Sequence, residues 1–458
     1  MKRLLVALAA LCLLVLSTTG IVLVVRNQQR QAATRRFIDA GPASLAREEA
    51  AARQEGIPLT AQQLQRPLPP PAQNAAPLYT KLTKLLHDKP LGLPKYAEGM
   101  DAFHSYTPAQ IAAVRRTLAA RQDVMTLVHQ AADKPQCVFA RDWSKGAKLE
   151  FPEYQPMREA ARLIKTESYL LARDGHYQEA VTNQARGFRV AEHAASDPAL
   201  ISYLVGVASE AITLSGMQSI LILAGPDAAV DAGVQQTVAA RHSRLSLRRA
   251  MAGEAGFYSA FFVRMHRGEK DGVSAAFAAG GFPDETARIV RPSAEERHNL
   301  HNLIDAWEAD YLMRMRPLVV ASDQPPPARH TAYTLVDEQV KRDSDDPASI
   351  THIFTDILLP VLGKIDQNDT RTRAREAVTV AAATILAART KTGAFPNKLP
   401  PGFADPFTDR PLLYRREGAG FIIYSAGPTG RFDGGKPGEK VSGQESLFRY
   451  PTVPLPPV

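Results

Sequence analysis

Two histidines and one aspartate have a spacing that could hold a metal ion. His298, His301 and Asp305 lie three and four residues apart, shortly after the run Ser293-Ala294-Glu295-Glu296. That run is a capping box and predicts the start of a helix. Side chains at positions i, i+3 and i+7 of a helix lie on the same face. Because two imidazoles and a carboxylate can bind zinc or iron, these three residues are the candidate metal ligands.

Other catalytic motifs are missing from the sequence. It has no His-Glu-x-x-His run, no Gly-x-Ser-x-Gly elbow, no phosphate-binding loop and no Gly-x-Gly-x-x-Gly run. Its two cysteines, Cys12 and Cys137, are far apart, which excludes a disulfide framework and a cysteine zinc site. We therefore expect no resident cofactor and favour a role other than catalysis. The alternative is an extracytoplasmic hydrolase or metalloenzyme with its site in the helical body.

The basic charge of the chain is concentrated at its N-terminus. The net charge is +8, yet residues 1–36 hold six basic side chains and no acidic one. The other 422 residues carry 49 basic and 47 acidic side chains. Nucleic-acid binding needs a concentrated basic face. The sequence therefore predicts no nucleic-acid partner.

The segment Leu4–Val25 predicts a membrane anchor. It contains 22 residues without a charge, and a helix of that length spans about 33 Å, against about 30 Å for a hydrocarbon core. A cleaved signal peptide is the alternative, but the chain becomes apolar again at residues 21–25, after the small residues 17–20. Basic side chains flank both ends of this segment, so the positive-inside rule hardly favours one orientation over the other. The short tail before the segment favours a body on the far side of the membrane from that tail.

Helical patterns dominate the rest of the chain and predict a mainly α fold. Residues 1–36 form the anchor and its basic flank, and Gly41-Pro42 should end the helix that leaves the membrane. A helical stub and a proline-rich spacer occupy 37–77, a multi-helix body 78–365, and a small α+β module with a short antiparallel sheet 366–458. The predicted helices are Pro108 to about Ala131, Pro156–Arg173, Tyr177–Ala195, Pro198–Leu223, a helix from Ser293 to about Val320, and Thr370–Thr390; the predicted strands are Leu412–Arg415 and Phe421–Tyr424.

One turn resembles a tetratricopeptide repeat. The run Gly175-His176-Tyr177-Gln178-Glu179-Ala180-Val181 is similar to the link between the two helices of such a repeat. A single copy is present, and arrays of this kind need about three copies for stability. We therefore expect an α-hairpin within a bundle and infer no peptide binding from it.

A second resemblance concerns the last part of the chain. Residues 393–399 read Gly-Ala-Phe-Pro-Asn-Lys-Leu, residues 405–407 read Asp-Pro-Phe, and residues 424–427 read Tyr-Ser-Ala-Gly. This order resembles the C-terminal headpiece of type II secretion major pseudopilins, a module also similar to the tails of bacterial membrane-anchored envelope proteins. The resemblance implies that residues 371–435 form one helix packed on a small antiparallel sheet. The aromatic side chains expected in its core are Phe395, Phe407, Tyr414 and Phe421.

The resemblance also has limits that shape the functional expectation. The N-terminal cleavage and methylation signature of pseudopilins is absent, so the protein is not a pilus subunit. Pseudopilin headpieces hold calcium through acidic residues of the last loop, where this chain keeps only Asp433 and has Thr429 in place of the usual aspartate. Calcium needs six or more oxygens, so calcium is not expected. The sequence predicts a single-pass protein of the bacterial inner membrane, with an extracytoplasmic body and a structural or protein-interaction role.

Overall fold

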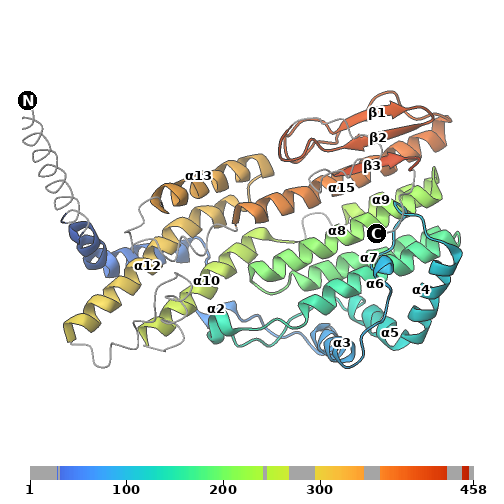
Figure 1. The fold of residues 1–458 in the computed structure, drawn as a ribbon. Helices are drawn as coiled ribbons and strands as arrows, with labels where there is room; N and C mark the ends of the chain where they lie inside the picture. Colours follow the sequence, from blue (N-terminus) through green and yellow to red (C-terminus); the bar gives the residue numbers. More distant parts are fainter. Residues whose placement is uncertain are drawn as a thin grey trace, which may run out of the picture. The chain divides into compact units, whose positions relative to one another are not determined.

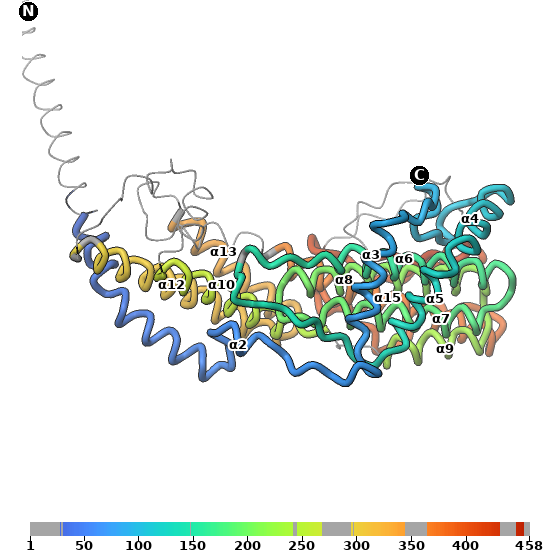
Figure 2. The backbone as a smooth tube through the Cα atoms, turned by 90° about the horizontal axis from the view of Figure 1, so that it is seen from below, coloured from blue at the N-terminus to red at the C-terminus, as the bar shows by residue number. Residues whose placement is uncertain are grey.

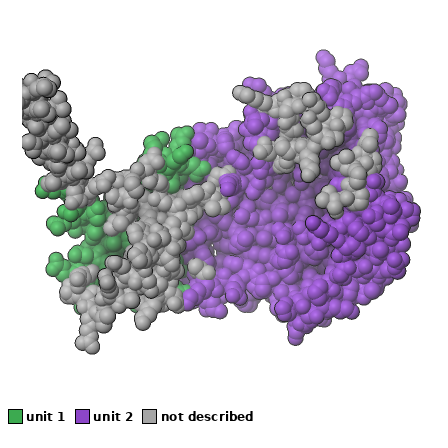
Figure 3. All heavy atoms as spheres, in the orientation of Figure 1, with its two compact units in different colours: residues 1–59, 259–316, 336–360 green, residues 60–258, 317–335, 361–458 purple. Residues whose placement is uncertain are grey.

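The computed structural model describes residues 28, 31–240, 245–267, 294–344, 362–430 and 446–452. The chain divides into two compact units (Figure 3). Unit 1 holds residues 1–59, 259–316 and 336–360; unit 2 holds residues 60–258, 317–335 and 361–458. The predicted anchor Leu4–Val25 and the calcium candidate Asp433 lie outside the described residues.

The described part of the chain is mainly helical, with one small sheet (Figure 1). This confirms the predicted mainly α class and the short antiparallel sheet. Unit 2 contains α2 (Ala61–Leu64), α3 (Ala76–Asp88), α4 (Pro108–Ala120), α5 (Gln122–Ala132), α6 (Tyr154–Arg173), α7 (Tyr177–Ala194), α8 (Leu200–Ala224), α9 (Ala228–Ala239) and α15 (Leu362–Thr392), the 3-10 turns Lys95–Ala97 and Trp143–Lys148, and strands β1 (Leu413–Glu417), β2 (Gly420–Tyr424) and β3 (Leu447–Tyr450). Three further helices, α10 (Leu247–His266), α12 (Ala294–Ala321) and α13 (Pro326–Ser344), have residues in both units.

Helices α6, α7 and α8 pack against one another and form the centre of unit 2. The link from α6 to α7 is the hairpin that the Gly-His-Tyr run predicts, and Gly175 adopts a φ of 84°, which glycine accepts without a steric penalty. Close approach of α7 and α8 also depends on glycine. A Cβ atom on Gly206 would lie 2.6 Å from the Cβ of Ala195, well inside normal contact distance.

Helix α8 is apolar enough and long enough to cross a membrane, and among the described residues it is the one helix that passes this test. Slightly more than half of its apolar window, 56%, is buried within the protein. It packs against α6, α7, α9 and α15, and its buried Gln218 donates a hydrogen bond to Thr379 Oγ1 at 3.1 Å. A helix surrounded by other helices is expected to be apolar all round, so its packing accounts for its composition.

The C-terminal part of unit 2 is layered, with α15 between the sheet and the pair α8 and α9 (Figure 1). The strands pair antiparallel in the order β1-β2-β3. The carboxylate of Asp405 joins two of the motifs on which the headpiece resemblance rests. It accepts hydrogen bonds from Ser425 Oγ at 2.8 Å and from the backbone N–H of Ala426 at 2.7 Å. The Asp-Pro-Phe run thus fixes the turn after β2.

Two details of this segment differ from the prediction. The sheet has a third strand, β3, which the sequence patterns did not indicate and which carries the fully buried Phe448. Phe395 and Phe421 are buried as expected, and Tyr414 packs against the same cluster. Phe407 is only half-buried and is not part of this cluster, in which Phe448 of β3 stacks on Phe421.

Unit 1 contains a helix that the sequence predicted incorrectly. Residues 31–54 are helical, and Gly41-Pro42 does not end this helix. Gly41 has a packing role: a Cβ atom there would lie 2.1 Å from the carbonyl oxygen of Asn302 in α12. Arg316 of α12 donates to Glu48 Oε2 at 2.6 Å and to Glu55 Oε1 at 2.5 Å, which holds the two segments together.

Two further predictions for the first half of the chain need correction. The helix predicted from Pro108 to about Ala131 does begin with the Thr107 capping box, but it breaks at Arg121 into α4 and α5. The proline-rich stretch 56–77 is not a free spacer, since Leu64 is buried against Trp143. The predicted boundary near residue 366 also differs from the division above, in which residues 361–458 belong to the same unit as residues 60–258.

Unit 2 encloses a network of buried charges between α13, α15 and α8. The guanidinium of Arg329, 1% exposed, pairs with Asp366 at 2.5 Å and with Asp369 at 2.6 Å. Tyr203 donates to Asp369 as well. Burial alone would raise the pKa of Asp369, but Arg373 and Arg329 lower it below the ordinary value. Each charge has an opposite partner, so the network is structural.

Candidate functional site

The structure brings together two of the three predicted metal ligands and adds a third residue that the sequence analysis missed. His266, at the end of α10, places Nε2 2.9 Å from Asp305 Oδ1 and Nδ1 3.2 Å from His301 Nδ1. His298 is apart from this cluster, with its Nε2 3.4 Å from Asn302 Nδ2. No sequence pattern links α10 to α12, so His266 could be found only from the packing of the two helices within unit 1.

Across the described ranges, no three or more His, Cys, Asp or Glu side chains are arranged to hold a metal ion. Cys137 is buried, and burial raises the pKa of its thiol far above the ordinary value. A nucleophilic cysteine needs a lowered pKa and access to solvent. Cys137 is therefore a packing residue.

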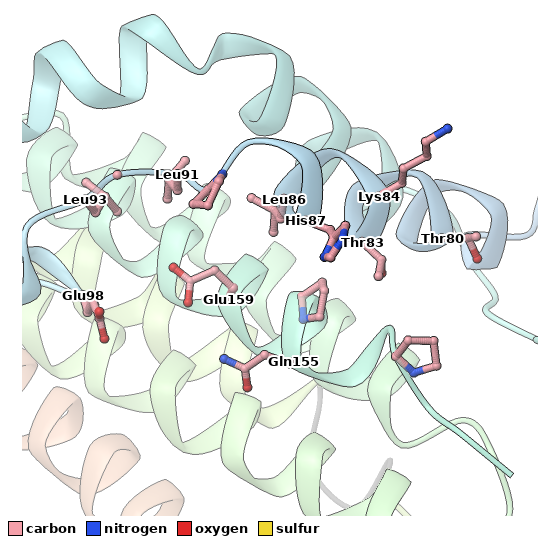
Figure 4. Close-up of a pocket in the computed structure, with 14 residues that line it drawn as sticks. Thr80, Thr83, Lys84, Leu86, His87, Leu91, Leu93, Glu98, Gln155 and Glu159 are labelled. Atoms are coloured by element: carbon pink, nitrogen blue, oxygen red, sulfur yellow. The ribbon is translucent and has the colours of Figure 1, made fainter. Parts of the chain in front are cut away.

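One feature that could bind a ligand is a cleft in unit 2 between α3, the turn after it and the start of α6. We name it the α3–α6 cleft (Figure 4). Its volume is about 840 Å³, which lies within the range of about 300–1,000 Å³ typical of ligand sites. It is lined by Thr80, Thr83, Lys84, Leu86, His87, Pro90, Leu91, Gly92, Leu93, Glu98, Pro152, Gln155, Pro156 and Glu159.

The first wall is one face of α3. Its lining residues 80, 83, 84 and 87 follow the i, i+3, i+4, i+7 spacing of a single helix face. The other side of α3 is held in the core by Tyr79 and Leu82, both almost completely buried. Tyr79 also has its hydroxyl 3.1 Å from His193 Nδ1 of α7. The buried side thus fixes the orientation of the face that lines the cleft.

The second wall comes from α6 and the third from the turn. Pro152, just before α6, and residues 155, 156 and 159 of its first turns line the cleft. Figure 2 shows α3 running beside α5 and α6. The turn Pro90-Leu91-Gly92-Leu93 leaves α3 with Gly92 at a φ of 74°. Arg121, at the break between α4 and α5, donates to the carbonyl oxygens of Lys89 and Pro90 and so holds this turn.

Apolar and acidic groups meet at one end of the cleft. Figure 4 shows Leu91 and Leu93 on one side and Glu98 and Glu159 on the other, while Lys84 points away from the cavity. Glu159 accepts from Arg162 at 3.2 Å. Glu98 is exposed and its carboxylate has no ion pair within the described part of the chain. This end therefore presents an apolar surface beside an unneutralised negative charge.

Unit 1 has a smaller pocket of about 270 Å³ between residues 37–48 and α12. Phe37 and Met313 are among its lining residues, and Met313 is 49% exposed. The α3–α6 cleft is larger, so it is the better candidate site. No family model, curated protein or solved structure matches this chain.

Proposed function

We propose that this protein is a single-pass, membrane-anchored envelope protein that binds a partner through the α3–α6 cleft. The observation that carries the proposal is the cleft itself, which is large, mainly apolar and open to solvent. An apolar site with a few polar groups is suited to binding and orienting a ligand.

The lining indicates the chemistry of the ligand. Three leucines and three prolines supply apolar contact. The carboxylate of Glu98 favours a positive charge, since Glu159 is paired with Arg162 and Lys84 is directed away from the cavity. The ligand that fits best is an apolar peptide segment carrying a basic side chain, because the basic group would pair with Glu98 while leucine-like side chains fill the cavity.

The location of the protein is part of the same proposal. The uncharged segment Leu4–Val25 supports an anchor in a bacterial inner membrane, with the body outside the cytoplasm. The headpiece resemblance supports an envelope protein, and the Asp405 carboxylate joins two of the motifs that carry this resemblance. In this account the tail belongs to the structural framework of unit 2, and the cleft is the binding site.

Anchoring and orientation can be tested in cells. Arg47→Cys and Lys398→Cys both introduce thiols at exposed positions. Buried Cys137 should not react, and Cys12 is replaced by Ser in all variants. Both new thiols should be labelled by a membrane-impermeant maleimide in intact cells with a permeable outer membrane. Labelling only after lysis would contradict the orientation.

The anchor itself is tested by deleting residues 1–30, which leaves the helix 31–54 in place. The truncated chain should be released into the soluble fraction, while the full chain stays with membranes in high salt. A truncated chain that remains membrane-bound would show that Leu4–Val25 is not the anchor.

Binding can be tested with two short peptides of equal apolar content, one alternating leucine with lysine and one alternating leucine with glutamate. The full-length protein in detergent should bind the lysine peptide about fivefold or more tightly, since each exposed ion pair contributes up to about 1 kcal/mol. Leu91→Asp should weaken binding about tenfold or more, because it removes apolar contact and adds a charge. Leu68→Asp, at a leucine that is 57% exposed outside the cleft, is the matched control and should bind normally.

A further inference from the structure

We propose that His266 and His301 bind one divalent transition-metal ion between their Nδ1 atoms, with Asp305 fixing the orientation of His266. The site belongs to unit 1 and is formed by α10 and α12. It concerns residues outside the α3–α6 cleft and does not depend on the function proposed for that cleft.

The hydrogen bond to Asp305 determines which nitrogen of His266 can bind a metal. His266 Nε2 lies 2.9 Å from Asp305 Oδ1, so Nε2 carries the proton and donates it to the carboxylate. In the neutral imidazole the lone pair is then on Nδ1, which faces His301. Metal-bound histidines almost always donate their other ring N–H to a carboxylate, a carbonyl or water. His266 already has that arrangement.

The distance between the two imidazoles also fits a shared ion. The two Nδ1 atoms are 3.2 Å apart. Two nitrogens bound to one tetrahedral zinc at 2.0–2.1 Å are about 3.3–3.4 Å apart. With the two Nδ1 atoms about 0.1–0.2 Å further apart, and the two rings turned so that both lone pairs point at the same position, one ion can bind both nitrogens.

Two imidazoles leave part of the coordination sphere to water. The His301 side chain is exposed and the His266 side chain is 25% exposed, so water can reach the site. Such a site agrees with the finding that no group of three ligating side chains is arranged around an ion within the described ranges. Imidazole ligands favour Zn²⁺, Cu²⁺ or Ni²⁺ over Mg²⁺ or Ca²⁺, which prefer oxygen.

Metal binding requires one proton movement. With His266 Nδ1 as acceptor, neutral His301 donates its Nδ1 proton across the 3.2 Å contact. When the ion binds, this proton leaves Nδ1 and the Nε2 of the exposed His301 ring takes up a proton from water. The ring stays neutral, and both Nδ1 lone pairs are directed at the metal. If no ion binds, the same contact is a simple hydrogen bond between two histidines.

Calorimetric titration with Zn²⁺ tests the proposal on the full-length protein in detergent, purified without a polyhistidine tag and stripped by a chelator. One ion should bind per chain. His266→Ala and His301→Ala should each remove the binding, and His301 is exposed, so its replacement should leave the fold intact. Asp305→Asn should weaken binding about 10–100-fold, the usual effect of losing an outer-shell partner. His298→Ala is the matched control on the same helix and should leave the affinity unchanged.

A spectroscopic readout separates a two-imidazole site from unspecific surface binding. With bound Cu²⁺, the electron paramagnetic resonance spectrum of the wild type should show hyperfine coupling to two nitrogens, and this spectrum should be absent from His301→Ala. Zinc affinity that is equal in the wild type and in the His266→Ala/His301→Ala double variant would overturn the proposal. So would an equal loss of affinity in His298→Ala.

Discussion

Arg121 donates a hydrogen bond from Nη1 to the carbonyl oxygen of Pro90, at 2.9 Å. The same nitrogen lies 2.8 Å from the carbonyl oxygen of Lys89, so one guanidinium closes the C-terminal end of α3. The residues that follow, Leu91 and Leu93, line the α3–α6 cleft. The shape of the cleft thus depends on an arginine that is 3% exposed and lies outside it.

Replacing this arginine should lower both stability and binding. Arg121→Ala removes two hydrogen bonds from a charged donor to backbone carbonyls and should reduce the free energy of unfolding by about 2–4 kcal/mol. Affinity for the leucine–lysine peptide should fall as well, because the turn at Pro90 is no longer held. Chemical denaturation and fluorescence anisotropy measure the two effects. Arg115→Ala serves as control, since its ion pair with Asp174 is about half exposed and should contribute less than about 1 kcal/mol.

The two phenylalanines of the tail should differ in their contribution to stability. Phe421 is fully buried among Phe395, Tyr414 and Phe448, and Phe421→Ala should cost about 3–5 kcal/mol. Phe407 is half-buried, and Phe407→Ala should cost distinctly less, about 1–2 kcal/mol. Urea denaturation of both variants gives the comparison. Equal losses would show that Phe407 belongs to the core after all.

The free energy of unfolding should fall with rising pH because of one carboxyl group in unit 1, that of Glu308. Burial raises the pKa of Glu308 to about 8, and the neighbouring carboxylates Glu49 and Asp305 add to the rise. The stabilisation from the neutral carboxyl is fully present below the unfolded value of about 4.3 and is lost as the pH rises through about 8. The folded protein holds this proton across that window while the unfolded chain releases it.

Comparing the wild type with Glu308→Gln at pH 5.5 and pH 8.5 tests this dependence. The free energy of unfolding of the variant, relative to that of the wild type, should be higher at pH 8.5 than at pH 5.5. The difference should be about 1.4 kcal/mol for each pH unit from pH 5.5 up to the folded pKa of about 8. Glu338→Gln, at a side chain that is 58% exposed, should show no such gain. A difference between wild type and Glu308→Gln that is equal at both pH values would contradict the raised pKa.

Local patterns predicted much of the fold. Caps and hydrophobic periodicity are signals carried by residues close together in the sequence. They were enough to predict the helix start at Thr107, the helices on either side of Gly175 and the helix ending near Val320. Predictions from local patterns were wrong where a residue is required for a contact with a segment far away in the sequence. Gly41 looked like a helix end because glycine commonly ends helices, but its missing side chain makes room for the Asn302 carbonyl of α12.

The candidate sites were less accessible to sequence analysis. The spacing of residues 80, 83, 84 and 87 marks a helix face, but which element lies opposite depends on the packing of α3 beside α6. Arg121 and His266 act on residues 31 and 35 positions away, respectively, through contacts that no local pattern contains. His298 satisfied the spacing rule and still lies outside the cluster. Spacing determines which face of a helix a side chain lies on, but it does not determine which element packs against that face.

The most direct test of the central claim is the position at which a bound peptide contacts the protein. A leucine–lysine peptide carrying a benzophenone is cross-linked to the full-length protein, and the cross-linked residues are identified by mass spectrometry. The account predicts cross-links within residues 80–98 and 152–159, present in Leu68→Asp and lost in Leu91→Asp. Cross-links that fall elsewhere, or that persist unchanged in Leu91→Asp, would contradict binding in the α3–α6 cleft.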